Sequence, residues 1–407
     1  MNFYIFINQY ASTPKEGFGG RYYYFSKALQ ENGNKVLLVT SANHHLLRNK
    51  PKFKGLWKFK NYNGLEVLWL KTLPYSKASS PIRVLNWFLF SLYLPFLVFL
   101  KIKPQQVHYS SPSPIGFIGA WLLSRLVKAK SVFDVRDVWP STLVEIGGIS
   151  PRNLFVRMLY RIEYFCLKYS DVVTSNLANM DLRLKELNID TCKFFWFSNG
   201  VDQKGVENSL LNSTLSLPQE CSGKTVIGYT GTLGEANSLY TMLNVAKMLE
   251  NREELIFIIV GDGKERVALL DFCVSNNINN VIFMNSVAKN DIYKLQSQMD
   301  ILCVGAKDCS LYRYGVSPNK LYEYIYSGVP VVYYINTPNY HPVLDAKCGR
   351  EVSPSDTREF AQAVLELIEL TDEDKKNIDK SAKDYIRKNH MYKNLALNLV
   401  IAVDNHD

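Results

Sequence analysis

Several hallmarks of familiar protein classes are missing from this chain of 407 residues. Its seven cysteines are odd in number, scattered and without a C-x-x-C pair, which argues against structural zinc and a disulfide framework. The chain has no recognised nucleic-acid-binding module and no long basic tail. No basic leader precedes the strand-like start MNFYIFINQY. We therefore predict a protein of a reducing compartment, the cytoplasm, that binds no nucleic acid.

What the chain does contain is enough apolar material for large cores. Hydrophobic residues make up 47% and charged residues 21%, as in globular proteins. The length suits two domains of about 100–200 residues each. The net charge of +9 and the pI near 9.0 favour anionic partners, namely nucleotides, phosphorylated substrates or a membrane surface.

One apolar segment, 84–103, is uncharged for seventeen residues up to Leu100, although Asn86, Ser91 and Pro95 interrupt it. A membrane-spanning helix needs about 20 apolar residues, so a helix that lies on the bilayer fits better. A core helix of the first domain is an equally good interpretation of the segment alone.

A second segment, 46–60, holds six cations and no acidic residue, with aromatic and leucine side chains between the cations. Basic residues near anionic lipid contribute about 1 kcal/mol each, and interleaved aromatic residues favour the membrane interface. A solvated basic loop is the alternative. The two neighbouring segments together favour contact with a membrane.

Strands and helices are predicted to alternate in both halves of the chain, which implies parallel sheets wrapped by helices. The pattern stops at a polar, linker-like run over 198–224 and then restarts. Two Rossmann-like domains with a cleft between them are the expected architecture. Predicted strands cover 3–8, 35–41, 106–110, 131–135, 171–175 and 193–197 in the first half, and 225–230, 255–260, 281–284, 301–305 and 329–335 in the second.

Glycine-rich turns follow three of the predicted strands, where ligands of such sheets bind. Their backbone N–H groups could cradle phosphates, and three turns facing one cleft indicate a bound diphosphate. The dinucleotide fingerprint needs a third glycine where Arg266 stands, so NAD is a poor match. The turns contain Gly17, Gly19 and Gly20, then Gly228, Gly231 and Gly234, then Gly261 and Gly263.

The stretch SPNKLYEYIYSGVPVV, 317–332, predicts a short helix followed by a strand. Ser317 suits the N-cap and Pro318 the first helical position, and Gly328 suits the end. The free N–H groups at such a helix start attract anions. Lys320 and Glu323 are either a surface pair worth about 0.2–0.5 kcal/mol or part of a binding site.

Four separated stretches resemble glycosyltransferase family 4 in their order and spacing. They are SNGVD (198–202), GYTGTL (228–233), VGDGKER (260–266) and the stretch over 317–332. The resemblance implies a GT-B fold, an α/β fold of two Rossmann-like domains, and retaining transfer from a nucleotide-sugar donor. Segment 133–140, FDVRDVWP, resembles a subgroup of bacterial surface-polysaccharide transferases that use acetamido sugars such as N-acetylfucosamine.

The resemblance also implies domain bounds and roles. The acceptor-side domain would cover 1–197, the nucleotide-sugar domain 198–385, and a helix at 386–407 would pack back on the first domain. Glu323 matches the second glutamate of an E-x7-E motif that holds the donor ribose, and Lys320 would face the diphosphate. Val287 would contact the base.

Three departures from the family pattern change these roles. Gly315 stands where the first glutamate should be. Thr232 replaces an arginine, with Asn237 or Ser238 near the position of a missing lysine. Other groups must then meet the phosphate charge, so the predicted donor-binding residues are Gly19, Gly20, Arg21, Gly231, Thr232, Gly261, Lys264, Arg266, Val287, Arg313, Gly315, Ser317, Pro318, Asn319, Lys320, Leu321 and Glu323.

The third departure concerns the predicted catalytic residues. Many family members have His-Asp where this chain has Arg136-Asp137. An arginine cannot act as a base, so Asp137 is the candidate for the acceptor hydroxyl and Arg136 for charge stabilisation. The one Asp-x-Asp match, Asp372-Glu-Asp374, lies in a polar stretch that indicates a solvated helix start. We expect no metal and no cofactor besides the donor, of UDP type.

The resulting hypothesis is a hexosyltransferase of bacterial O-antigen or capsule synthesis. It would use a nucleoside diphosphate sugar and a glycan acceptor linked to polyprenyl diphosphate, as a peripheral protein on the inner face of the cell membrane. Two alternatives stay open, a nucleotide-sugar 2-epimerase of the same fold and a non-catalytic scaffold for glycan synthesis.

Overall fold

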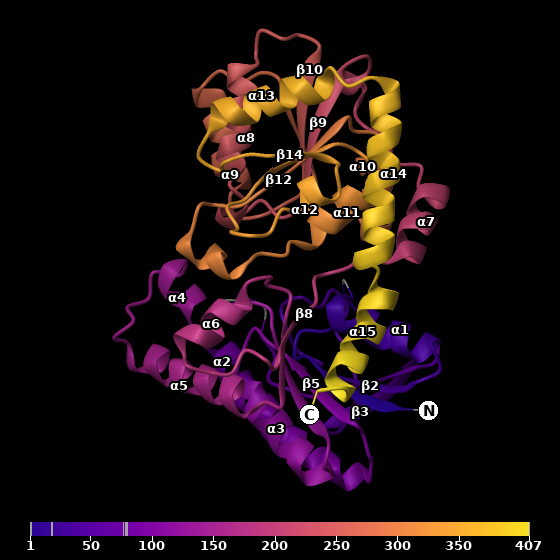
Figure 1. Cartoon of the computed structure of the whole chain (residues 1–407), viewed down its shortest axis with the longest axis vertical. Coiled ribbons are helices and arrows are strands. Elements are labelled where there is room, and N and C mark those ends of the chain that lie inside the picture. The colour runs from indigo at the N-terminus through magenta and orange to yellow at the C-terminus, as the bar shows by residue number, and fades with distance from the viewer. Residues whose placement is uncertain (1, 18, 76, 78–79, 407) are drawn as a thin grey trace. The chain divides into compact units, whose positions relative to one another are not determined.

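The computed structural model of the chain describes residues 2–17, 19–75, 77 and 80–406. It contains two compact units (Figure 1). The first unit comprises the chain up to Ser198 together with Tyr314–Val316 and the segment from Tyr392 onward. The second unit comprises Asn199–Arg313 and Ser317–Met391.

The first unit is built on an eight-stranded sheet of order β3-β4-β2-β1-β5-β6-β7-β8. All neighbouring strands are parallel except β3 and β4, which form the hairpin that the Asn63-Gly64 turn predicts. The inner strands are rich in valine, isoleucine and leucine because helices cover both faces. The strands are β1 (Phe3–Ile7), β2 (Lys35–Ser41), β3 (Trp57–Tyr62), β4 (Leu65–Leu70), β5 (Gln106–Ser110), β6 (Lys130–Val135), β7 (Val172–Ser175) and β8 (Phe194–Trp196).

Helices lie on both sides of this sheet, with α3 and α5 on one side and α1 and α15 on the other (Figure 1). The last helix, α15, packs on α1, where the rings of Tyr24 and Tyr392 stack 4.8 Å apart. The helices are α1 (Arg21–Glu31), α2 (Pro81–Tyr93), the 3₁₀ helix η1 (Leu94–Leu100), α3 (Ile115–Val127), α4 (Ser141–Glu145), α5 (Leu154–Tyr169), α6 (Met180–Glu186) and α15 (Tyr392–Asp404).

The predicted apolar helix is confirmed and begins earlier than 84. It consists of α2 and η1, and the change to 3₁₀ geometry coincides with Pro95. Trp87, Phe90 and Leu94 are buried, and α2 and η1 pack on α3. Among the described residues, Pro81–Leu100 is the one helical stretch that is long and apolar enough to cross a membrane, with a mean hydropathy of 1.7. Core helices of globular proteins can have the same length and composition.

The second unit contains a six-stranded parallel sheet of order β11-β10-β9-β12-β13-β14. Its strands are β9 (Thr225–Thr230), β10 (Leu255–Val260), β11 (Val281–Met284), β12 (Ile301–Gly305), β13 (Val331–Tyr334) and β14 (Gly349–Glu351). Its helices are α7 (Gln203–Asn212), η2 (Gln219–Cys221), η3 (Glu235–Asn237), α8 (Leu239–Met248), α9 (Arg266–Ser275), α10 (Lys289–Gln296), η4 (Ser310–Tyr314), α11 (Asn319–Ser327), α12 (Pro342–Asp345), α13 (Thr357–Ile368) and α14 (Asp372–Asn389).

One local prediction for this half is wrong. The run over 198–224 is not a linker, because it contains α7, which packs on α10. Val206 and Ser209 face the protein, and the Ser209 hydroxyl accepts a hydrogen bond from the Lys294 backbone N–H at 3.3 Å. The wider prediction of an α/β fold with two Rossmann-like domains is confirmed.

Candidate functional site

Lys320 lies in the first turn of α11, in the second unit, and points toward the loop after β9. Its ammonium donates to the Tyr229 hydroxyl at 2.6 Å and to the Asn237 side-chain oxygen at 2.9 Å. It also lies over the Tyr229 ring, 4.1 Å from the centroid. A methyl group on Gly231 would come within 2.9 Å of the Lys320 Nζ. The structure thus brings together Lys320 and Gly231, two of the predicted donor-binding residues.

The charge of Lys320 has no carboxylate partner among the described residues. Burial lowers the pKa of Lys320 to about 7, and the negative charge of Glu323 opposes this effect only in part. A half-buried amine of this kind gains most from an anion that arrives with a ligand. The ring and the amide hold it in place without neutralising it.

Glu323 lies one turn further along α11 and pairs with α10. The Lys289 ammonium donates to Glu323 Oε1 at 2.6 Å, and the Tyr293 hydroxyl donates to the same oxygen at 3.0 Å. The surface pair between Lys320 and Glu323 is therefore not formed among the described residues. Both bonds end on Oε1, and 11% of the glutamate side chain is exposed.

The glycine loops after β9 and β10 pack directly on each other. A methyl group on Gly261 would meet the Gly231 carbonyl oxygen at 1.8 Å, so this approach requires glycine. The Gly231 N–H donates to the Val260 carbonyl at 2.9 Å, and the Gly261 N–H donates to the Met284 carbonyl at 3.1 Å. These two N–H groups are thus used inside the protein, contrary to the expected phosphate cradle. Thr232 follows Gly231 and is exposed.

The other cations predicted to meet phosphate charge differ in their surroundings. Arg266 Nη1 donates to the carbonyls of Gly261 and Met284 at 2.9 and 3.1 Å, so Arg266 joins the ends of two strands. Lys264 is exposed in the loop before α9. Arg313 is exposed in η4, where Nη1 donates to the Ser310 carbonyl at 3.0 Å. Val287 follows β11 and is partly buried.

The start of α11 differs by one residue from the predicted cap. Pro318 is the N-cap and Asn319 the first helical residue, so the prediction of Ser317 as N-cap is wrong. The Ser317 hydroxyl instead accepts from the Asn199 N–H at 3.2 Å and lies 3.0 Å from the Tyr322 hydroxyl. Leu321 is buried, and its N–H donates to the Pro318 carbonyl at 3.1 Å. Gly328 ends the helix with positive φ, as predicted.

Gly315 groups with the first unit, whereas α11 belongs to the second. Its φ is +104°, and a methyl group there would lie 2.4 Å from the Ala178 backbone nitrogen. A glutamate at this position would therefore be strained and would clash with the backbone. The close contact accounts for the departure from the E-x7-E pattern.

In the first unit, the loop that contains Gly19 and Gly20 is held by Glu16. The Glu16 carboxylate accepts from Lys60 at 2.8 Å, from the Tyr62 hydroxyl at 2.7 Å and from Thr13. Burial raises the pKa of Glu16, but these hydrogen bonds outweigh burial and leave it below its usual value. The Gly19 N–H is engaged by the Ser12 hydroxyl at 3.2 Å.

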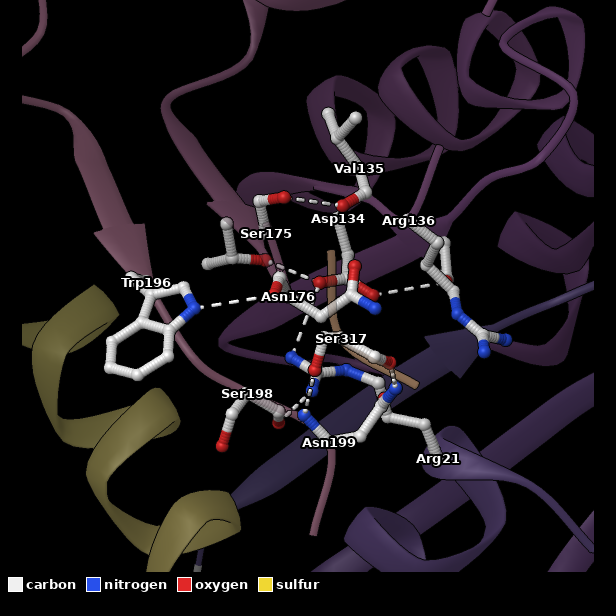
Figure 2. A network of polar contacts seen from close by, with 12 residues as sticks. Arg21, Asp134, Val135, Arg136, Ser175, Asn176, Trp196, Ser198, Asn199 and Ser317 are labelled. Carbon is white, nitrogen blue, oxygen red and sulfur yellow. Dashed lines mark hydrogen bonds and ion pairs between the residues drawn. The ribbon is translucent and has the colours of Figure 1, made fainter. Parts of the chain in front are cut away.

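Arg21, the next predicted phosphate cation, lies inside the first unit instead (Figure 2). Its guanidinium donates to the Ser198 carbonyl and lies 3.5 Å from the Asp134 carboxylate, and both side chains are fully buried. Thr174 and Ser110 donate to Asp134 at 3.0 and 2.9 Å. The placement of Arg21 gives it a structural partner and offers no support for a role at phosphate.

The predicted catalytic residues follow β6. The Arg136 N–H donates to the Ser111 hydroxyl at 2.9 Å, and its side chain extends from the strand end (Figure 2). Asp137 is exposed, and its carbonyl accepts from the Trp139 N–H at 2.9 Å. Although the residue is exposed, burial around its carboxyl group raises the pKa of Asp137 above its usual value, and the positive charge of Arg136 opposes this effect.

Within the described ranges, the structure has no group of three or more His, Cys, Asp or Glu side chains that could hold a metal ion. The Asp372-Glu-Asp374 segment is the first turn of α14, where Asp374 and Thr371 form a capping box. This is the helix start that its sequence indicates.

Four residues of the candidate site were not predicted from sequence. Tyr229 and Asn237 position Lys320, while Lys289 and Tyr293 hold Glu323. Asn237 carried a signal, because it stands near the missing family lysine. Lys289 and Tyr293 lie 34 and 30 residues from Glu323, and no local pattern marks them.

Solved structures of low sequence identity show the fold of the chain. The E. coli trehalose-6-phosphate structure bound with UDP-2-fluoro glucose aligns with a TM-score of 0.75 over 99% of each chain, at 11% identity. Anabaena Alr3699/HepE in complex with UDP and glucose aligns with a TM-score of 0.64 over 99% of this chain and 100% of the other, at 12% identity. The chain therefore has the GT-B fold.

Sequence comparison relates part of the second unit to a known family. Residues 224–370 match the family described as glycosyl transferases group 1. The colanic acid biosynthesis glycosyl transferase WcaI of Escherichia coli K12 is 22% identical over 63% of this chain and 64% of its own length. The glycosyltransferase WbjE of Pseudomonas aeruginosa is 25% identical over 44% of this chain and 46% of its own length. The chain thus matches less than two thirds of the length of either relative.

Proposed function

We propose that the protein is a retaining, metal-independent glycosyltransferase of polysaccharide synthesis. It transfers a hexosyl group of acetamido type from a nucleoside diphosphate donor, of UDP type, to a hydroxyl of a lipid-linked glycan precursor. The group 1 match at 224–370 and the names of both relatives support the class. The UDP ligands of two proteins with the same fold support the donor.

The observation that carries this proposal is the uncompensated ammonium of Lys320. The first turn of α11, the Tyr229 ring and Asn237 hold it beside Gly231. A diphosphate supplies two negative groups to a half-buried cation at a helix start, which is where anions bind. Glu323, one turn away, is a carboxylate that can accept from a vicinal diol such as the ribose.

In the proposed reaction the bond between the anomeric carbon and the diphosphate oxygen breaks, and its electron pair leaves with the nucleoside diphosphate. The acceptor oxygen forms the new bond on the same face, and its proton passes to Asp137. Lys320 stabilises the negative charge that grows on the leaving diphosphate. Arg136 supplies a second positive charge near Asp137.

A donor panel tests the binding half of the proposal. Nucleoside diphosphate sugars are added one at a time, and the unfolding temperature is measured. A true donor at 100 times its dissociation constant adds about 2.7 kcal/mol to the stability of the folded state. If no nucleotide shifts the transition, the chain is a scaffold. If the sugar is altered without any acceptor present, it is an epimerase.

The variant Asp137→Asn tests the catalytic half. Loss of the proton acceptor should lower turnover by about 10²–10⁴-fold while donor affinity stays nearly unchanged. Normal turnover in this variant would reduce Asp137 to a structural residue at the end of a strand.

We propose that the protein is located on the inner face of the cell membrane as a peripheral membrane protein. The lipid-linked acceptor requires this location, and the exposed apolar residues of α2 and η1 favour it.

A further inference from the structure

The helices α2, η1 and α3 of the first unit pack together and expose rows of apolar side chains. Along α2 and η1 the exposed side chains recur at helical spacing, and α3 adds a parallel row at i, i+4 spacing. Their exposed fractions range from 38% at Ile118 to 76% at Phe99. The surface, which we call the helix-pair face, consists of Ile82, Leu85, Phe88, Leu92, Phe96, Phe99, Ile118, Leu122 and Leu126.

The two helices that carry this face are locked together by a backbone contact. A methyl group on Gly119 would lie 2.0 Å from the Ser91 carbonyl oxygen. The Ser91 hydroxyl donates to the Ile115 carbonyl at 3.0 Å and accepts from the Gly119 N–H at 3.1 Å. The inner sides of the helices are buried through Phe90, Leu94 and Leu123. The backbone contact and the buried inner side chains thus fix the two helices side by side, so the exposed rows of the helix-pair face are a candidate interaction surface.

Positive charge predominates in the chain segment that carries this face. Residues 67–133 contain eight lysines and arginines and no aspartate or glutamate. Gln106 of β5 pairs with Lys130 of β6, so the amino ends of these strands lie together. Lys101 and Lys103, before β5, and Lys128, before β6, therefore gather at one end of the helix-pair face, and all three are exposed.

A cavity of about 530 Å³ lies at the same end, beside the last turn of α3. Arg125, Lys128 and Lys130 line it, together with Asp171, which pairs with Arg125 at 2.7 Å. The cavity offers a net positive site next to the exposed Leu126.

We propose that the helix-pair face is the docking surface for an anionic lipid bilayer. The apolar rows enter the level of the headgroups, and the cations at the amino ends of β5 and β6 meet lipid phosphates. This deepens the proposed function by assigning its membrane partner to α2, η1 and α3 rather than to 46–60. Binding to bare vesicles does not require the transferase reaction, so a negative vesicle result would contradict the docking surface without contradicting the proposed transferase activity.

The geometry favours a helix pair that lies on the membrane over one that spans it. One face of Pro81–Leu100 is fixed in the core of the first unit, and Asn86 is buried with both side-chain hydrogen bonds made to Leu73. Spanning would remove Trp87, Phe90 and Leu94 from that core. An in-plane amphipathic helix needs only the exposed face.

The experiment is flotation with vesicles of neutral lipid and of neutral lipid mixed with anionic phosphatidylglycerol, using the full chain. The parent should bind the anionic vesicles, more weakly as salt rises, and alkaline carbonate should release it. The triple variant Leu92→Ser, Phe96→Ser, Phe99→Ser should bind at least tenfold more weakly. The variant Lys101→Gln, Lys103→Gln, Lys128→Gln should lose about tenfold or more of its affinity for anionic vesicles.

The matched control is Lys52→Gln, Lys54→Gln, Lys58→Gln, which removes the same charge from exposed positions of 46–60. It should change vesicle binding less than twofold. Thermal unfolding and UDP binding, measured for every variant, confirm folding. Loss of vesicle binding in the control variant alone would contradict the proposal and would assign membrane docking to 46–60 instead. A parent that ignores vesicles but dimerises through Phe96 and Phe99 would replace the bilayer with a second copy. Retention after carbonate would indicate a spanning helix.

Discussion

Two buried or half-buried cations, one in each unit, behave in opposite ways. Arg21 in the first unit is fully buried and lies against Asp134 and the Ser198 carbonyl. Lys320 in the second unit has an aromatic ring and an amide oxygen but no carboxylate partner among the described residues. A compensated charge of this kind supports the fold, whereas an uncompensated one is a candidate for function. Sequence alone assigned both cations to phosphate.

The largest expected effect comes from breaking the compensated pair. Asp134→Ala leaves Arg21 buried without a counter-charge and removes the acceptor of Thr174 and Ser110. We expect a loss of about 3–5 kcal/mol in the free energy of unfolding, measured with denaturant. A loss below about 1 kcal/mol would mean that the pair is not compensating a buried charge.

Next in size is the effect of Glu323→Ala on the donor. Removing a charged acceptor costs about 1.5–3 kcal/mol, which is a ten- to hundredfold loss of UDP affinity in calorimetry. A ligand without ribose hydroxyls should lose much less. The control is Lys289→Ala, which keeps the carboxylate. Equal losses for both ligands would contradict the ribose assignment.

Lys320→Met should weaken binding of the nucleoside diphosphate without weakening binding of the nucleoside. UDP affinity should fall by about tenfold or more, since a charged contact is worth about 1.5–3 kcal/mol, while uridine binding changes little. Arg266→Met is a useful comparison, because Arg266 already donates to two carbonyls. If Lys320→Met weakened uridine and UDP equally, the lysine would not face the diphosphate.

The pKa of Lys320 gives a smaller effect with a definite sign. Folding lowers it from 10.5 to about 7, so the unfolded chain binds more protons between these values and stability rises with pH across that window. Binding of UDP should restore the charge, with proton uptake at pH 8 seen by calorimetry in buffers of different ionisation enthalpy. Lys320→Met should lose both the slope and the uptake. Uptake that persists in this variant would assign the proton elsewhere.

The smallest effect is expected for an exposed ion pair, in contrast to the buried pair of Arg21 and Asp134. Lys247 and Glu250 form a pair at 2.6 Å whose side chains are about 40% exposed. Glu250→Ala should change the free energy of unfolding by less than about 0.5 kcal/mol. A loss of unfolding free energy as large as that of Asp134→Ala would show that burial does not explain why the two ion pairs differ in their contribution to stability.

Much of the fold was predictable because its signals are local. Alternating apolar strands, the Asn63-Gly64 turn and the glycine at 328 each mark their own element. The partner of Arg21 was not predictable, since Asp134 lies 113 residues away and the Gly19-Gly20 turn before Arg21 suggested a phosphate site. The glycines at 231 and 261 were recognised correctly as special, but they serve the contact between two loops. A glycine-rich motif in the sequence indicates an unusual backbone conformation or a close contact, but it does not show whether the contacting group is a ligand or another loop of the protein.

The last helix has a consequence for how the protein is made. Leu395, Ala396 and Leu399 of α15 are buried in the same core as Phe25 of α1, and the Gln106 side chain donates to the Val400 carbonyl at 2.9 Å. The residues that complete the first core are therefore translated after the whole second unit. During translation the emerging first unit exposes apolar side chains of α1 that α15 later covers. We expect chaperones to hold it in that interval and protease sensitivity to disappear once α15 has emerged.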